Sequence, residues 1–215
     1  MPEALQINTR KDLVADRIRD RILRGSFKPG ARLDQVLIAE ELNVSRSPVR
    51  EALRTLDAEG LITSIPNKGA VVTERSLAEL KELYFTRSLI EGIAAERAVP
   101  HIKQKTLDKL DAILYSATRL SDHGDLLTLN NEFHLLIYRS FPQPFIIQII
   151  QQLRNMAAPY NSLYLDTDGN IQQAWADHRK IFDACVNRDP QKVRLETQKH
   201  LDRVCESLIR AANSE

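Results

Sequence analysis

The stretch QVLIAEELNVSRSPVREALRT, residues 35–55, decides the fold of the N-terminal part of this chain. It predicts two helices joined by a turn too short for an ordinary loop. The turn falls at Asn43, and Asn is one of the few residues besides glycine that tolerate a left-handed backbone. Apolar residues repeat with helical spacing in both halves of the stretch: Leu37, Ile38, Leu42, Val49 and Leu53.

The second helix of this pair begins with residues suited to a DNA groove. Ser45 can cap it, with Pro48 in the first turn; in the alternative register Ser47 is the cap and Pro48 the first helical residue. Both registers leave Arg46, Ser47 and Arg50 facing outward. Guanidinium groups pair with guanine or phosphate and hydroxyls with backbone oxygens, which predicts a helix-turn-helix that binds double-stranded DNA. The competing interpretation is an amphipathic helix pair whose arginines are only solvated.

A third helix and a β-hairpin flank this pair. Thr9 is a suitable cap for a helix, and after it comes a helical stripe of apolar residues that ends at Gly25: Leu13, Val14, Ile18, Ile22 and Leu23. Residues 61–73 contain two β-rich runs around a turn with Pro, Asn and Gly. Lys68 and Gly69 at the tip of the hairpin are suited to contact phosphate or a neighbouring minor groove, because glycine permits close backbone approach. We therefore expect a winged helix-turn-helix in residues 1–75.

The charge of the chain is nearly balanced, with 30 Lys and Arg against 29 Asp and Glu. Residues 1–75 carry a formal charge of +2 and residues 76–215 a charge of −1. A non-specific nucleic-acid coat would be far more basic. Any DNA contact therefore has to come from a small patch, and two copies of the chain would double that patch.

The composition favours a helical cytoplasmic protein. Gly and Pro are scarce, at 7 and 9 of 215 residues, and no apolar run approaches the roughly 18 residues of a membrane span. The N-terminus lacks the basic and apolar regions of a signal peptide. Cys185 and Cys205 do not form a C-x-x-C motif, so we expect unpaired thiols.

The sequence of residues 76–215 predicts an antiparallel all-α bundle. Ser76 is a suitable cap for the first helix of this bundle. Pro and Gly divide this part into six predicted helices, which span 77–98, 104–121, 125–141, 144–164, 170–187 and 190–212.

Three of these helices carry a histidine in the middle of an apolar stripe. They are His134, His178 and His200, and Asn130 lies one turn before His134 on the same face. A single histidine of this kind is usually a hydrogen-bonded core residue. Three on inward faces, with a carboxamide nearby, instead suggest a site for Zn²⁺, Ni²⁺ or a similar divalent ion with coordination positions left open.

Arg87 is a charged residue on a helix face that is otherwise apolar and includes Tyr84. One interpretation is a buried ion pair with Glu91, one turn later. The other is that Arg87 binds the carboxylate of a small effector, because the planar guanidinium fits a carboxylate. Asn161, with Tyr160 and Tyr164 beside it in the sequence, could line the same cavity: these residues lie near the end of one predicted helix.

Residues 10–75 resemble the DNA-binding domain of the GntR family of bacterial transcription regulators. The resemblance lies in Phe-Lys-Pro-Gly-Ala-Arg-Leu, in Leu-Ile-Ala-Glu-Glu-Leu-Asn-Val-Ser-Arg-Ser-Pro-Val-Arg-Glu-Ala-Leu, in Leu-Asp-Ala-Glu-Gly-Leu-Ile and in Pro-Asn-Lys-Gly-Ala-Val-Val. It implies operator contacts by Arg46, Ser47 and Arg50, with Ser45 and Gly69 on the DNA backbone. It also implies a homodimer on a palindromic site. Asn43 stands where this family usually has glycine.

The helical half is similar to the FCD ligand-binding domain of the FadR-type branch of that family. Many of its members hold a metal through an Asp-x-x-x-His pair and two later histidines, and they commonly recognise small organic acids. Asn130, His134, His178 and His200 match these positions in order, with Asn130 in place of the Asp. The neutral Asn oxygen implies a weaker or different metal.

We therefore expect a DNA-binding transcriptional regulator that responds to a small carboxylate bound near a divalent metal. A repressor is the favoured kind of regulator. We expect no catalytic residues and no enzymatic activity. The alternatives are a metal-dependent enzyme with an accessory helix-turn-helix, and a metal that only stabilises the bundle. Neither a His-Glu-x-x-His motif nor a nucleophile with its base is present to favour the enzyme.

Overall fold

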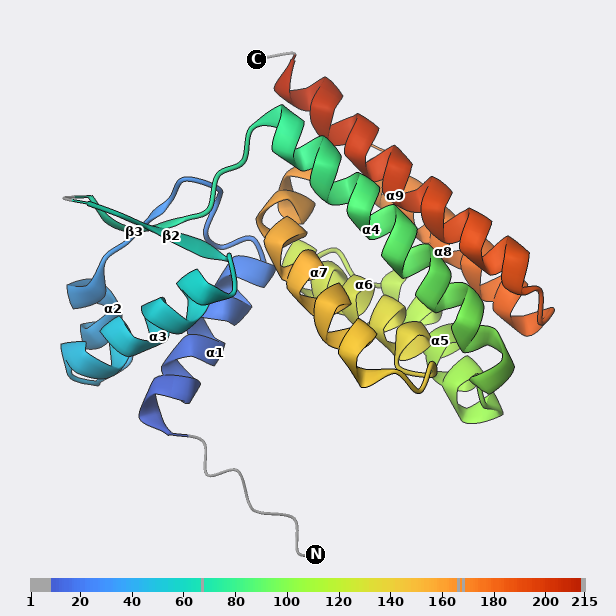
Figure 1. The fold of residues 1–215 in the computed structure, drawn as a ribbon, viewed down its shortest axis with the longest axis horizontal. Helices are drawn as coiled ribbons and strands as arrows, with labels where there is room; N and C mark the ends of the chain where they lie inside the picture. Colours follow the sequence, from blue (N-terminus) through green and yellow to red (C-terminus); the bar gives the residue numbers. More distant parts are fainter. Residues whose placement is uncertain (1–8, 67, 166, 168, 214–215) are drawn as a thin grey trace, which may run out of the picture.

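The computed structural model describes residues 9–66, 68–165, 167 and 169–213. Figure 1 shows two parts side by side: a small lobe formed by the first part of the chain and a longer bundle of helices formed by the rest. The N-terminal lobe comprises α1 to β3, and the bundle comprises α4 to α9. The predicted architecture, a winged helix-turn-helix followed by a helical bundle, is confirmed.

The helices of the N-terminal lobe pack around one small apolar core. They are α1 (Arg10–Leu23), α2 (Gln35–Glu41) and α3 (Arg46–Ala58). Thr9 caps α1 in a capping box with Asp12, in which each side chain binds the backbone N–H of the other residue. Asn43 has a φ of 50°, so the left-handed turn expected between α2 and α3 is present.

The start of α3 decides between the two predicted registers. Ser45 is the N-cap residue and has an extended backbone, so the helix begins at Arg46 and the register with Ser47 as cap is wrong. The Ser45 hydroxyl makes no capping hydrogen bond. The first N–H groups of α3 and this hydroxyl therefore remain available to a ligand.

Two residues of the predicted apolar stripes lie at the surface. Leu13 is 52% exposed and Leu37 is 63% exposed. In α2 the residues that reach the core are Ile38 and Ala39. This helix has only seven residues and buries one narrow face, so Leu37, on the opposite side, is left in solvent.

A three-stranded antiparallel sheet completes the lobe. The predicted hairpin is formed by β2 (Ile62–Ile65) and β3 (Gly69–Val72), and its turn residue Asn67 lies outside the described residues. A further strand, β1 (Arg32–Leu33), precedes α2 and pairs with β3, which gives the order β1-β3-β2. Gly69 has a φ of 82°, a conformation that favours glycine.

The helices of the bundle follow the predicted order closely. They are α4 (Leu77–Ala98), the short 3₁₀ helix η1 (Val99–His101), α5 (Gln104–Ala117), α6 (His123–Tyr138), α7 (Pro144–Leu165), α8 (Asn170–Val186) and α9 (Pro190–Ala212). The predicted helix 104–121 ends early, where the Thr118 hydroxyl binds the Tyr115 carbonyl at 2.7 Å. The helix predicted at 125–141 is shifted to 123–138, because Asp122 caps it through the Asp125 N–H.

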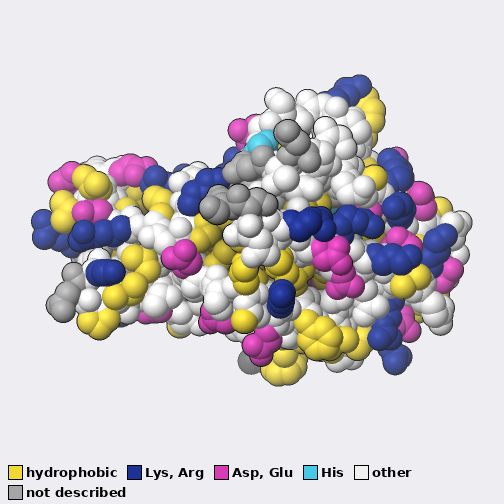
Figure 2. All heavy atoms as spheres, turned by 90° about the horizontal axis from the view of Figure 1, so that it is seen from above, with side chains coloured by type: hydrophobic (Ala, Val, Ile, Leu, Met, Phe, Trp, Pro, Cys, Tyr) yellow, Lys and Arg dark blue, Asp and Glu magenta, His cyan; other side chains and the backbone are white. Residues whose placement is uncertain are grey.

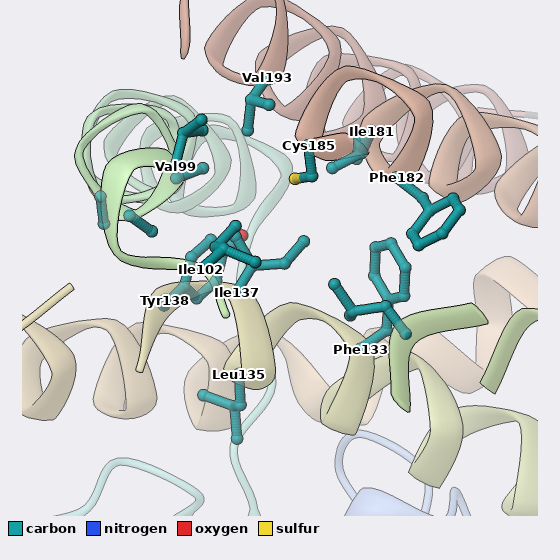
Figure 3. Packing of buried hydrophobic residues seen from close by; sticks show 14 of the residues in the cluster. Val99, Ile102, Phe133, Leu135, Ile137, Tyr138, Ile181, Phe182, Cys185 and Val193 are labelled. Carbon is teal, nitrogen blue, oxygen red and sulfur yellow. The ribbon is translucent and has the colours of Figure 1, made fainter. Parts of the chain in front are cut away.

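Apolar packing holds these helices together. Figure 3 shows Phe133 and Ile137 of α6 beside Ile181 and Cys185 of α8, and all four are buried. Burying an aliphatic or aromatic side chain of this size contributes about 1.5–3 kcal/mol. Such packing, more than intrinsic helix propensity, stabilises helices of this length. No helix in the described ranges combines the length and apolar character needed to cross a lipid bilayer.

Candidate functional site

Three histidines from three helices meet inside the bundle. His134 comes from α6, His178 from α8 and His200 from α9, and all three are buried. One ring nitrogen of each lies within 4.8 Å of the others, and the Nε2 atoms of His134 and His178 are 3.1 Å apart. Asn130 is half-buried and lines the same cavity. The four residues singled out in the sequence thus border a single space.

All three imidazoles are uncharged near neutral pH. Burial first, and then the Arg154 guanidinium among other neighbours, lowers the pKa of His134 well below its ordinary value. Burial also lowers the pKa of His178 well below that value, with His200 next in effect. Burial, followed by Arg87 and Arg154, lowers the pKa of His200 to about 3. Neutral imidazole is the form that binds a metal ion.

A hydrogen-bond chain determines which nitrogen of His134 carries the proton. The Tyr138 hydroxyl donates to Glu91 Oε2 at 2.8 Å, and a carboxylate can only accept. His134 Nδ1 lies 3.2 Å from the same hydroxyl oxygen. Because the Tyr138 proton is already directed at Glu91, Nδ1 must be the donor in this contact. The Nε2 atom of the neutral ring is then unprotonated, and it lies on the side of His178.

Glu91 is fully buried between two arginines. Arg87 Nε lies 2.6 Å from Glu91 Oε1, and Arg154 Nη1 lies 2.9 Å from Oε2. Burial by itself would raise the pKa of Glu91, but the two guanidiniums outweigh it and the pKa lies below its ordinary value. The group therefore has two positive charges and one negative charge. The ion pair between Arg87 and Glu91, one of the two sequence interpretations, is present.

Arg87 also borders the histidine cavity, so the ion pair does not exclude contact with a ligand. Arg154 of α7 lies in the same wall and was not identified in the sequence. It follows Ile150 by one helical turn on a buried face, and an arginine at that spacing is the signal that was overlooked. No carboxylate belongs to the described part of the cavity wall.

The predicted polar residues of the cavity divide into two groups. Tyr84 and Asn161 both line it, and the Tyr84 hydroxyl donates to Asn161 Oδ1 at 3.3 Å. Tyr164 lines it as well, and its buried hydroxyl has no hydrogen-bond partner within the described residues. Tyr160 was wrongly included, because its hydroxyl instead accepts the Arg75 backbone N–H at the junction with the N-terminal lobe.

Asp177 is a buried carboxylate beside the site that the sequence analysis did not use. Its Oδ2 lies 3.7 Å from His200 Nδ1, and it forms ion pairs with Arg203 and Lys180. Its position directly before His178 in the sequence was the available signal.

The predicted DNA-contacting residues are all exposed. Arg46, Ser47 and Arg50 are exposed on α3, and neither arginine forms a salt bridge with a described residue. Lys68 and Gly69 are exposed at the tip of the hairpin, and no other residue approaches the Cβ position of Gly69 within 4 Å. Figure 2 shows Lys and Arg side chains gathered at the outer end of this lobe, on the left.

The lobe and the bundle touch through α1 on one side and α6 with α7 on the other. Arg24 Nη1 lies 3.1 Å from Asp125 Oδ1. A second cavity lies between Asp20 and Leu23 of α1 and a wall that includes Arg154. Arg154 thus borders both the histidine cavity and the contact with the N-terminal lobe.

Comparison with known families matches both halves of the chain. Residues 10–72 match the model described as bacterial regulatory proteins, gntR family, and residues 82–203 match the FCD domain. The sequence is 30% identical over 175 residues to the gluconate operon transcriptional repressor of Bacillus subtilis, covering 79% of this chain and 70% of that protein.

Two Escherichia coli proteins are also similar. The transcriptional repressor RspR is 28% identical over 203 residues, with coverage of 92% of this chain and 89% of RspR. The solved structure of McbR/YncC superposes with a TM-score of 0.86 at 23% identity, covering 95% of this chain and 99% of that one. At that identity the superposition establishes a shared fold.

The lowered histidine pKa values predict how stability depends on pH in chelator-treated protein. Below the unfolded pKa of about 6.5, the unfolded chain binds protons that the folded chain does not, so the free energy of unfolding falls as pH falls. Each histidine contributes a slope approaching about 1.4 kcal/mol per pH unit. Urea denaturation at pH 7, 6 and 5 should show this fall, and His200→Gln should reduce the slope by about one third. Equal slopes for the two proteins would contradict the assignment of a neutral, buried His200.

Proposed function

Because this chain belongs to the GntR family of transcriptional regulators and carries the FCD effector domain, we propose that a small carboxylate bound in the histidine cavity controls its affinity for DNA. In this proposal residues 1–75 bind a palindromic operator, residues 76–215 bind the effector and join two copies, and the protein acts as a repressor on cytoplasmic DNA. The observation that carries the proposal is the meeting of three neutral histidines and two arginines in one cavity.

We assign a divalent metal, zinc or nickel, to His134, His178 and His200, with Asn130 as the oxygen donor. Tetrahedral Zn–N bonds of about 2.0–2.1 Å place two ligand nitrogens about 3.3 Å apart. The separation of 3.1 Å between the Nε2 atoms of His134 and His178 agrees with such a pair. The unprotonated Nε2 of His134 further supports this assignment, whereas four neutral ligands imply weaker binding than a set with a carboxylate.

The charges in the cavity favour an anionic effector. Arg87 and Arg154 contribute two positive charges against the single negative charge of Glu91. Arg87 is our candidate for the carboxylate contact, because a guanidinium pairs with a carboxylate in a bidentate way. Tyr84 and Asn161 then supply hydrogen bonds beside it. A bound metal would add positive charge and an open coordination position for an effector oxygen.

The DNA-binding role is assigned to the exposed residues of α3 and the wing. Arg46 and Arg50 are free to reach base edges or phosphates, and the hydroxyls of Ser45 and Ser47 suit backbone oxygens. Lys68 and Gly69 suit a contact with the flanking backbone. Two copies related by a two-fold axis would place two α3 helices about one DNA turn apart.

Arg154 supports a route from the cavity to the DNA-binding lobe. It binds Glu91 in the bundle and donates to Asn131 at 3.2 Å, and it borders the space next to α1. An effector that repositions Arg154 would alter the contact between α7 and α1. Such coupling requires that the effector bind the two arrangements with different affinity.

The first test is a thermal-shift screen of small carboxylic acids on protein of known metal content, with and without chelator. We expect stoichiometric zinc or nickel and a rise in Tm for some acids only when metal is present, because the acid then binds the folded state. The same acids should change operator affinity. Acids that are turned over would favour an enzyme instead. Loss of the fold on chelation, without any acid response, would favour a purely structural metal.

A second test concerns the hydrogen bond from His134 to Tyr138. Tyr138→Phe removes the acceptor that fixes the protonation of His134, so metal affinity should fall by about 10–100-fold. Competition with a chromogenic chelator measures this on folded protein. The matched control is Tyr84→Phe, whose hydroxyl binds Asn161 and no histidine. If both variants bind metal as tightly as the parent protein, the assigned ligand geometry is wrong.

A third test concerns the DNA surface. Arg50→Ala should weaken binding to an operator selected from random DNA by about 5–150-fold, which corresponds to roughly 1–3 kcal/mol for a base contact. Lys109→Ala is the charge-matched control, because Lys109 is exposed on α5, far from α3 (Figure 1). Fluorescence anisotropy gives both affinities. An equal loss in the two variants would show a general charge effect and no specific contact.

A further inference from the structure

Asp177 is a buried carboxylate that has no role in the proposed site so far. It lies on α8 directly before His178, and α8 packs along α9, which carries His200 (Figure 1). Among the described residues the only other buried carboxylate is Glu91. Glu91 is matched by two buried arginines, so Asp177 is the buried negative charge that still requires an explanation.

Three hydrogen-bond donors already reach the Asp177 carboxylate. Gln173 Nε2 lies 3.0 Å and Lys180 Nζ 3.4 Å from Oδ1, and Arg203 Nη1 contacts Oδ2. The side chains of Lys180 and Arg203 are 52% and 34% exposed, so water screens both cations. A carboxylate accepts about four hydrogen bonds. One acceptor position is therefore left on a carboxylate whose cationic partners are screened.

The Nδ1 atom of His200 lies beside this carboxylate. It is 3.7 Å from Asp177 Oδ2, is buried, and has no hydrogen-bond partner among the described residues. A buried polar atom without a partner is costly and therefore needs an explanation. The two nitrogens of an imidazole lie on different edges of the ring. Because Nδ1 lies on the side of Asp177, Nε2 is the atom that can reach the cavity that His200 lines.

We propose that Asp177 positions His200 for metal binding by accepting the Nδ1–H of its ring and thereby keeping Nε2 unprotonated. A metal ion binds the unprotonated nitrogen of a neutral imidazole, so the proton has to stay on the other nitrogen. The hydrogen bond requires a distance below about 3.2 Å, so the two groups approach each other by about 0.5 Å when it forms. This inference rests on the proposed metal site and adds an outer partner to it.

The charge of Asp177 also compensates for a neutral set of ligands. Three imidazoles and the Asn130 carboxamide contribute no negative charge, and the ion-pair group around Glu91 has a surplus of one positive charge. A divalent ion in such buried surroundings requires a negative charge nearby. Asp177 supplies that charge through His200 without contacting the ion itself.

The alternative is that Asp177 only joins α8 to α9 through its ion pair with Arg203. Asp177→Asn keeps the size of the side chain and removes its charge, so zinc affinity should fall by about 10–100-fold in competition with a chromogenic chelator. Arg203→Gln breaks the same ion pair but leaves the carboxylate to His200, so zinc affinity should stay the same or rise. Asp183→Asn, the same change on an exposed residue of α8, should leave the affinity unchanged.

Proton NMR of the zinc-loaded protein measures the hydrogen bond itself. A charged acceptor strengthens the bond and moves an imidazole N–H resonance downfield. His200 should give such a resonance in the parent protein and in Arg203→Gln. In Asp177→Asn this resonance should shift upfield or vanish, a change that a purely structural ion pair does not predict.

Two results would overturn the role of Asp177 and leave the metal site intact. One is equal zinc affinity of the parent protein and Asp177→Asn. The other is a loss of zinc affinity in Arg203→Gln, because the ion pair alone would then explain the effect. The second result decides the question even if circular dichroism shows that Asp177→Asn does not fold. A parent protein that binds no zinc would overturn both this inference and the proposed metal site.

Discussion

The arrangement of the bundle depends on one buried carboxylate, Glu91. It lies fully inside the protein and accepts from Arg87 on its own helix, from Tyr138 on α6 and from Arg154 on α7. Removing one partner from a buried ionic group typically costs about 3–5 kcal/mol, because the remaining charge is left without compensation. Helices α4, α6 and α7 are therefore restricted to positions that keep all three hydrogen bonds.

The same network sets the electrostatics of the cavity. Its surplus of one positive charge opposes protonation of the neighbouring histidines and adds to the effect of their burial. The histidines are consequently kept in the form that binds metal, next to guanidiniums that suit an anion. In the proposed function, metal binding and anion binding would therefore depend on the same local charges. The Tyr138 hydroxyl links these charges to the protonation of His134.

The position of Arg154 extends this network toward the N-terminal lobe. Helix α7 contributes Arg154 to the Glu91 group and Tyr160 to the backbone of Arg75, just before α4 begins at Leu77. A displacement of α7 would therefore affect the junction that carries the wing, as well as the contact with α1. This physical connection is what an effector-dependent change in DNA affinity requires, since both sites must act on the same arrangement of elements.

The sequence by itself determined the elements and the residues with unusual surroundings. Asn43, Ser76 and the helix breakers mark helix ends through local backbone chemistry, and His134, His178 and His200 stand out because they interrupt apolar stripes. Local periodicity does not specify which buried face meets which, so Arg154, Tyr138 and Asp177 gained their roles only through the tertiary structure. The same limit explains Leu37 and Leu13, whose apolar character predicted burial although no element among the described residues covers them. The exposure of Phe85, Leu89 and Ile93 on α4 likewise required the folded chain, because only packing shows which apolar side chains of a helix remain uncovered.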